Sequence, residues 1–170
     1  MFPDDAAARA GRLLLLGIGN AIMTDDGVGI HVARRAAEIL PDDLRARVDV
    51  EEAATGGFDL VEYLAGYAAA VITDAVRTAD GAAGTVYQFD AAALKPTAHL
   101  AHVHGVNLAG ALAIAEQLEL PVPRDIVIVA VEAEEVYTFG EELTEDVAAA
   151  VEPAAQAALG ALRRLAQALP

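Results

Sequence analysis

The sequence of 170 residues contains no cysteine. This absence excludes disulfide bonds, zinc sites built on thiolates and a cysteine nucleophile. Any metal site in this chain must therefore use Asp, Glu or His side chains, or backbone oxygens.

Basic residues are scarce. Lys and Arg together number 11 against 26 Asp and Glu, which gives a formal net charge of −15. Binding to a nucleic-acid backbone requires clustered Lys and Arg, so we expect no nucleic-acid partner. The charge permits a metal ion or a basic peptide segment as ligand, although solubility alone also accounts for it.

Long apolar runs are also missing, since none approaches the roughly 18 to 20 residues that cross a bilayer. Residues 1–12, MFPDDAAARAGR, carry acids and lack the basic start and the apolar stretch of a signal peptide. We therefore predict a cytoplasmic protein that binds no membrane. Hydrophobic residues nevertheless make up 55% of the chain. This predicts one domain over residues 1–170, with residues 1–11 as a frayed leader and residues 12–168 folded.

Strand and helix patterns alternate along the chain. We predict strands over residues 12–16, 46–53, 68–76, 84–89 and 125–132. We predict helices over residues 26–40, 56–66, 105–118 and 143–168. This alternation is typical of an α/β fold, here a three-layer α/β/α arrangement with a twisted, mostly parallel five-stranded sheet flanked by helices. Ligands of such sheets bind beyond the carboxyl ends of the strands, so we expect the chemistry there.

The segment GIGNAIMTDDGVG, residues 17–29, follows the first predicted strand. A dinucleotide-binding fingerprint would need glycine where Ile22 stands, and the lysine of a phosphate-binding loop is absent. Asp25 and Asp26 instead indicate a cation. The alternative is helix capping, with Thr24 or Asp25 as N-cap and Asp26 in the first turn. Capping explains one acid but not the other.

Asp74 ends an otherwise apolar strand, where a carboxylate is costly to bury unless it is paired or bound to a cation. The alternative is a carboxylate that accepts N–H bonds from a loop. Three of the four histidines, His99, His102 and His104, lie in HLAHVHGVNL, and His104 is nearest the next helix. For His31 we favour a partly exposed helix face.

Two carboxylates and one imidazole from three loops form a mixed oxygen and nitrogen ligand set. Such a set suits Zn²⁺, Ni²⁺ or Fe²⁺ better than Mg²⁺ or Ca²⁺. Three protein ligands also leave coordination positions open, as in catalytic rather than structural sites.

These residues also carry a resemblance to a known family. GIGNAIMTDDGVG resembles the G-x-G-N-x-(L/I)-x-x-D-(D/E)-G-x-G signature of the [NiFe]-hydrogenase maturation proteases. Three later segments, ATGGFDLVEYL, VITDAV and HGVNLAGAL, look like further family elements, and FGEELTEDVAAAVEPA resembles the element near the C-terminus. The likeness runs in order from Arg12 to Ala168.

The resemblance implies an endopeptidase that removes the C-terminal extension of a [NiFe]-hydrogenase large-subunit precursor after nickel insertion. Nickel, supplied by the precursor, would be recognised by Asp26, Asp74 and His104, with zinc or another divalent ion able to take its place. The same three residues are the catalytic candidates. Attack by water is favoured, either with a metal-polarised carbonyl or with a carboxylate as general base, in the manner of aspartyl proteases.

The sequence departs from the family pattern at three positions. Asp26 stands where Glu is often found, and Ala133 and Glu145 replace prolines. Three other functions are weighed beside the peptidase: a nickel-binding assembly chaperone that cleaves nothing, a nucleotide-binding module and a receiver-like α/β module. The last would need a lysine after a late strand, and none follows Lys95.

Overall fold

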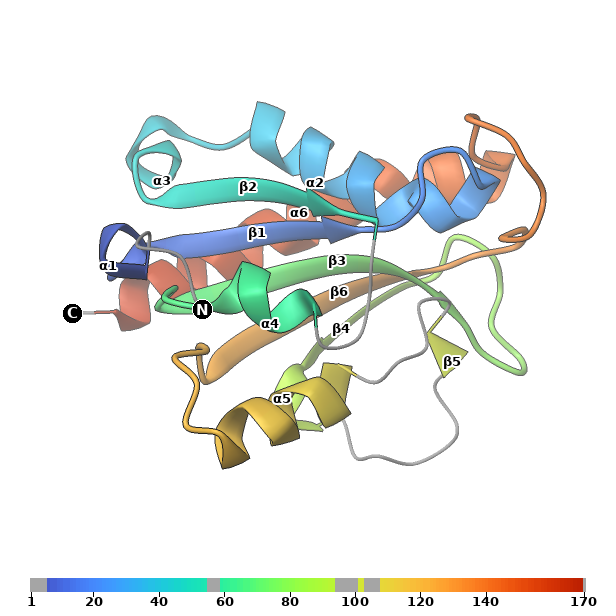
Figure 1. The fold of residues 1–170 in the computed structure, drawn as a ribbon. Helices are drawn as coiled ribbons and strands as arrows, with labels where there is room; N and C mark the ends of the chain where they lie inside the picture. The colour runs from blue at the N-terminus through green and yellow to red at the C-terminus, as the bar shows by residue number, and fades with distance from the viewer. Residues whose placement is uncertain (1–5, 55–58, 94–100, 103–107, 170) are drawn as a thin grey trace.

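The computed structural model describes residues 6–54, 59–93, 101–102 and 108–169 (Figure 1). Its strands are β1 (Leu13–Ile18), β2 (Val48–Ala53), β3 (Ala69–Arg77), β4 (Val86–Asp90), β5 (Ala101–His102) and β6 (Asp125–Glu132). Its helices are α1 (Ala6–Arg9), α2 (Val28–Glu38), α3 (Asp42–Arg45), α4 (Asp59–Leu64), α5 (Leu108–Gln117) and α6 (Glu145–Ala168). Two 3₁₀ turns, η1 (Thr24–Gly27) and η2 (Ala91–Ala93), complete the elements.

The strands form one sheet in the order β2-β1-β3-β6-β4. The pairs β1–β2, β1–β3 and β3–β6 are parallel, whereas β4 runs antiparallel to β6 at the edge. The predicted α/β fold with five mostly parallel strands is therefore confirmed. The two-residue strand β5, which was not predicted, pairs antiparallel with the end of β3.

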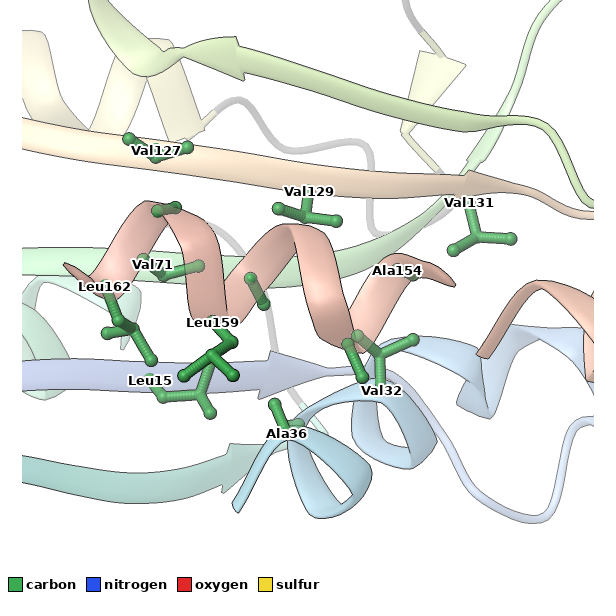
Figure 2. Close-up of a cluster of buried hydrophobic side chains, with 14 of the residues drawn as sticks. Leu15, Val32, Ala36, Val71, Val127, Val129, Val131, Ala154, Leu159 and Leu162 are labelled. Atoms are coloured by element: carbon green, nitrogen blue, oxygen red, sulfur yellow. The ribbon is translucent and has the colours of Figure 1, made fainter. Parts of the chain in front are cut away.

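One face of the sheet is covered by α2 and α6. Every second residue of β1, β3 and β6 points to this face and packs against small or branched side chains of the two helices, as Figure 2 shows for Leu15, Val71 and Val129. Alanines such as Ala36 and Ala154 allow the helices to approach closely (Figure 2). The alanine-rich composition thus serves tight helix packing.

The opposite face carries α4 and α5 and a second core cluster, to which Leu14, Ile72 and Ile128 belong. All four leucines from Leu13 to Leu16 are fully buried, because β1 is central and covered on both faces. The helices on the two faces and the sheet between them form three layers. Because β1, β3 and β6 are parallel, their carboxyl ends lie at one end of the molecule (Figure 1).

Part of the predicted frayed leader, residues 1–11, is helical in the described residues. Residues 6–9 form α1, and Arg9 donates to the carbonyls of Glu62 and Ala65 while its guanidinium lies 5.0 Å from the ring centroid of Tyr67. These contacts dock the helix beside α4. Among the described residues, no helix is both long and apolar enough to cross a membrane.

Candidate active site

Asp25 and Asp26 lie in the 3₁₀ turn η1, between β1 and α2, and both side chains are buried. The capping prediction for Thr24 and Asp25 is wrong. Helix α2 begins after Gly27, with no side-chain hydrogen bond at its N-cap. Both side chains bond elsewhere: the Thr24 hydroxyl donates to the Thr138 carbonyl (2.7 Å), and Asp25 accepts from the loop after β6.

The Asp25 carboxylate is a junction between distant segments. Its Oδ2 accepts the backbone N–H groups of Glu134 (3.0 Å) and Glu135 (2.9 Å) and the Thr144 hydroxyl (2.9 Å). Its Oδ1 accepts the backbone N–H of Thr144 at 2.7 Å. Asp25 therefore ties η1 to the loop after β6 and to the start of α6.

Asp26 is oriented differently within the same turn. Its Oδ2 accepts the backbone N–H of Asn20 at 2.9 Å, which closes the loop back on the end of β1. Gly19 has a φ of +152°, and a Cβ there would lie 2.2 Å from the Asp26 carbonyl oxygen. The loop can fold this tightly only because position 19 is glycine.

Asp74 is buried near the end of β3 and pairs in register with Ala130 of β6. Its Oδ1 accepts the backbone N–H of Ala75 at 2.8 Å. Ala75 belongs to β3 itself, so this bond does not test the alternative of a carboxylate that accepts N–H bonds from a loop. The sheet alternation directs Asp74 to the face of Ile72 and Val76, the face that carries α4 and α5.

Gly29 brings the two carboxylate-bearing segments together. A Cβ at Gly29 would lie 2.2 Å from the Ile18 carbonyl oxygen and 2.4 Å from that of Thr73, so the backbones of α2, β1 and β3 are in direct contact. The buried Thr73 hydroxyl donates to the Gly29 carbonyl at 2.7 Å. Because η1 directly precedes α2 and contacts β3, Asp26 lies at the end of the sheet where Asp74 emerges.

The predicted histidine ligand, His104, lies outside the described residues, as does His99. The backbone of His102 pairs with Val76, two residues beyond Asp74. The described part of the chain holds no group of three or more Asp, Glu or His side chains that could bind a metal ion, so the full ligand set stays a prediction.

His31 is partly buried on α2, as expected for a helix face. Its pKa is lowered, first by burial and then by the nearby Arg34 guanidinium. The Glu52 carboxylate opposes this lowering of the His31 pKa but does not outweigh burial.

Glu132 is a buried carboxylate that the sequence interpretation did not single out as a site residue. It ends β6, and its two oxygens accept the backbone N–H (2.6 Å) and the hydroxyl (3.1 Å) of Thr78. A Cβ at Gly81 would collide with this carboxylate, so the loop after β3 wraps closely over it. The signal that could have found it is the one that found Asp74, an acid at the end of an apolar strand.

The described residues thus include four buried carboxylates, all at or beyond the carboxyl ends of β1, β3 and β6: Asp25, Asp26, Asp74 and Glu132. The hydrogen bonds of Asp25 and Glu132 hold loops in place. Asp26 lies in the turn between β1 and α2, Asp74 lies near the end of the adjacent strand β3, and buried carboxylates at one end of a sheet favour a bound cation.

The comparisons with known proteins agree on one family. The sequence model described as "Hydrogenase maturation protease" matches residues 30–161, which include Asp74 and His104 and begin just after the GIGNAIMTDDGVG segment. The chain is 30% identical over 155 residues to "Hydrogenase 2 maturation protease" of Escherichia coli (strain K12), covering 89% of this chain and 91% of that protein. It is 29% identical over 154 residues to HoxM of Azotobacter vinelandii, a "Hydrogenase expression/formation protein", covering 88% and 72%.

Solved structures match over the same extent. The hydrogenase maturating endopeptidase HybD from E. coli superposes with a TM-score of 0.71 at 28% identity, covering 90% of this chain and 93% of that one. The [NiFe] hydrogenase maturation protease HybD from Thermococcus kodakarensis gives a TM-score of 0.63 at 30% identity, covering 86% and 96%. Sequence, fold and the acidic end of the sheet lead to one conclusion: the chain belongs to the hydrogenase maturation protease family and is a peptidase.

Proposed function

We propose that this peptidase removes the C-terminal extension of a [NiFe]-hydrogenase large-subunit precursor after nickel has been inserted. In this proposal Asp26, Asp74 and His104 bind the nickel that the precursor carries, and zinc or another divalent ion can take its place. The cytoplasmic location expected from the sequence stays a prediction.

The observation that carries the proposal is the close approach of α2 to β3 at Gly29, which holds two buried carboxylates at one end of the sheet. A buried pair of carboxylates is unfavourable without a proton or a cation between the groups, and a divalent ion removes that cost.

The position of His104 in the sequence fits this ligand set. His104 follows His102 by two residues, and His102 pairs with β3 just beyond Asp74. Two residues of chain span at most about 7 Å, so an imidazole from this segment is within reach of the acidic end of the sheet. Two oxygens and one nitrogen form a donor set that suits nickel or zinc.

Attack by water is the chemistry that the composition favours. The chain contains neither cysteine nor serine. The hydroxyl next to Asp74 in sequence, that of Thr73, is buried and donates to the Gly29 carbonyl. A water molecule at the acidic end of the sheet would be deprotonated by a carboxylate, while nickel in the precursor orients the scissile bond against it.

The test is cleavage of a nickel-loaded large-subunit precursor, followed by mass spectrometry of the released C-terminal peptide. We expect Asp26→Asn, Asp74→Asn and His104→Ala each to lower the rate at least about 100-fold. The matched control is Asp80→Asn, which removes one negative charge from an exposed position.

Intact processing by Asp74→Asn and His104→Ala would show that the site is elsewhere. Binding of the precursor that depends on nickel, without release of a peptide from it, would support the alternative of an assembly chaperone.

A further inference from the structure

Three large hydrophobic side chains are exposed on two neighbouring loops beside η1. Ile22 is 52% exposed, Tyr137 76% and Phe139 79%. We refer to these three residues as the apolar patch. Among the large hydrophobic residues that the structure describes, Tyr137 and Phe139 are the most exposed, and a grouped apolar surface of this kind indicates an interaction site.

Two loops distant in sequence carry the patch and are held to each other by their backbones. The Thr24 N–H donates to the Gly140 carbonyl (2.8 Å), and the Gly140 N–H donates to the Ile22 carbonyl (3.1 Å). The Thr24 hydroxyl bonds to the Thr138 carbonyl. Figure 1 shows the two loops side by side, one after β1 and one after β6.

The loop after β6 is also ordered from within. The Glu135 carboxylate accepts the backbone N–H groups of Tyr137 (2.7 Å) and Thr138 (3.2 Å), and these bonds lower the pKa of Glu135. The Arg77 guanidinium lies 5.9 Å from the ring centroid of Tyr137. The exposed side chains therefore project from a backbone that is already fixed, which lowers the entropic cost of binding.

The loops that carry the patch also carry or hold residues of the candidate active site. Ile22 precedes Asp26 by four residues, and Asp25 ties the same turn to Glu134 and Glu135. A partner that covers the patch therefore lies against the end of the sheet where Asp26 and Asp74 are found.

The surroundings of the patch restrict the chemistry of its partner. Glu134, Glu141 and Glu142 are exposed close to Tyr137 and Phe139 in the sequence, whereas Arg77 is the cation that lies near the Tyr137 ring. A second copy of this chain would bring the same acids against them, which like charges oppose. The backbone groups that join the loops are paired with each other, so these groups offer no free edge to an extended peptide. Protruding aromatic side chains instead fit hollows on a folded surface.

We propose that the apolar patch docks the folded body of the large-subunit precursor, through an apolar hollow with a basic rim beside its nickel centre. This proposal rests on the proposed function. Docking there supplies affinity and alignment, whereas Asp26, Asp74 and His104 act on the nickel and the scissile bond. Loss of the patch should therefore raise KM and leave kcat at saturating precursor within about twofold.

The experiment compares the native protein with the double variant Tyr137→Ser/Phe139→Ser on nickel-loaded precursor. We expect KM and the Kd for precursor to rise at least tenfold. The matched control is Leu118→Ser, because Leu118 is 59% exposed and directly follows α5, on the connection that leads to the amino end of β6. Far-UV circular dichroism and thermal unfolding check that both variants remain folded.

A second probe separates the folded body from the extension. It is a synthetic peptide with the C-terminal extension and the ten residues before the cleaved bond. We expect its affinity to be equal for the native protein and the double variant. An equal loss for peptide and precursor would assign the patch to the extension and overturn the proposal, as would dimerisation of the native protein that the double variant abolishes.

Unchanged KM in the double variant, with normal processing by the native protein, would overturn the docking site alone. Failure of the native protein to process the precursor would overturn the proposed function and the docking site together.

Discussion

Asp25 and Asp26 are adjacent residues with different surroundings. Asp25 accepts hydrogen bonds from three residues of the loop after β6 and the start of α6, whereas Asp26 accepts Asn20 N–H within its own loop. The first arrangement connects segments that are far apart in the sequence. We therefore expect Asp25 to serve stability, whereas Asp26 stays the proposed nickel ligand.

This assignment predicts that Asp25→Asn mainly lowers stability, whereas Asp26→Asn mainly lowers the rate of processing. Asp25→Asn replaces an acceptor oxygen by an NH₂ group that faces N–H donors, so the free energy of unfolding should fall by about 3 kcal/mol. Asp26→Asn keeps an oxygen for Asn20, so its unfolding free energy should change by less than about 1 kcal/mol although processing is lost. Urea unfolding measures both, with Asp80→Asn as control. A larger loss of stability for Asp26→Asn than for Asp25→Asn would reverse the assignment.

The sequence predicted Asp26 before a helix and Asp74 at a strand end, both at the end of the sheet where the carboxyl ends of parallel strands meet. The sequence did not reveal that Asp25 joins distant segments through hydrogen bonds. Locally, an acid before a helix predicts a cap, but the bonding partners of Asp25 lie 109 to 119 residues away. No local pattern encodes such partners, so they become visible only in the folded chain.

At the scale of elements, the contact between α2 and the sheet decides how closely η1, the turn that carries Asp26, lies to β3. Gly29 stands where a side chain would overlap the carbonyl oxygens of Ile18 and Thr73. Gly17 faces it from β1, and a Cβ there would lie 2.8 Å from the Cβ of Ala33. Small residues on α2 and β1 thus determine how closely α2 packs against the sheet.

Gly29→Ala should displace α2 from β3. Overpacking against backbone atoms should lower the free energy of unfolding by about 3 kcal/mol, and a displacement of about 1 Å should slow processing roughly 100-fold. The control is Gly160→Ala in α6, where the added methyl meets only the end of the Arg164 side chain at 3.6 Å. Because alanine favours the helical state, Gly160→Ala should stabilise by about 0.5–1 kcal/mol. Equal unfolding midpoints for the two variants would contradict this account.

The main elements were predictable, because buried parallel strands such as β3 read as unbroken apolar runs and amphipathic helices as 3.6-residue patterns. The misses have physical reasons. Strand β5 has two residues and is defined by its pairing with Val76 and Arg77. Two residues are too few to show the alternation of apolar and polar side chains that predicts a strand. Helix α1 is short and depends on Arg9 contacts with residues more than fifty positions later.

At the scale of the whole molecule, charge is the dominant feature. The net charge is −15, and several of the few cations are engaged in ion pairs, for example Arg12 with Asp49 and Arg34 with Glu52. The hydrogen bond from Arg12 lowers the pKa of Asp49, so this carboxylate stays ionised to lower pH than a free aspartate. The remaining acids repel one another across the folded surface, which opposes compactness.

Salt should therefore affect the isolated protein and its complex in opposite directions. Raising ionic strength from 0.01 M to 0.1 M shortens the Debye length from about 30 Å to about 10 Å. If screening adds about 1 kcal/mol of stability, the Tm should rise by about 2–4 °C. The same screening should slow association with a precursor whose contact surface is basic, by about tenfold in rate. Calorimetry and stopped-flow binding in NaCl measure the two effects.

The two outcomes test separate parts of the charge argument. A Tm that is constant or falls with NaCl would mean that self-repulsion of the acids does not limit stability. A rising Tm with a salt-independent association rate would mean that the acids near the apolar patch, Glu134, Glu141 and Glu142, do not attract the partner. Docking would then depend on Ile22, Tyr137 and Phe139 alone, and Glu141→Gln/Glu142→Gln should leave the Kd for precursor unchanged.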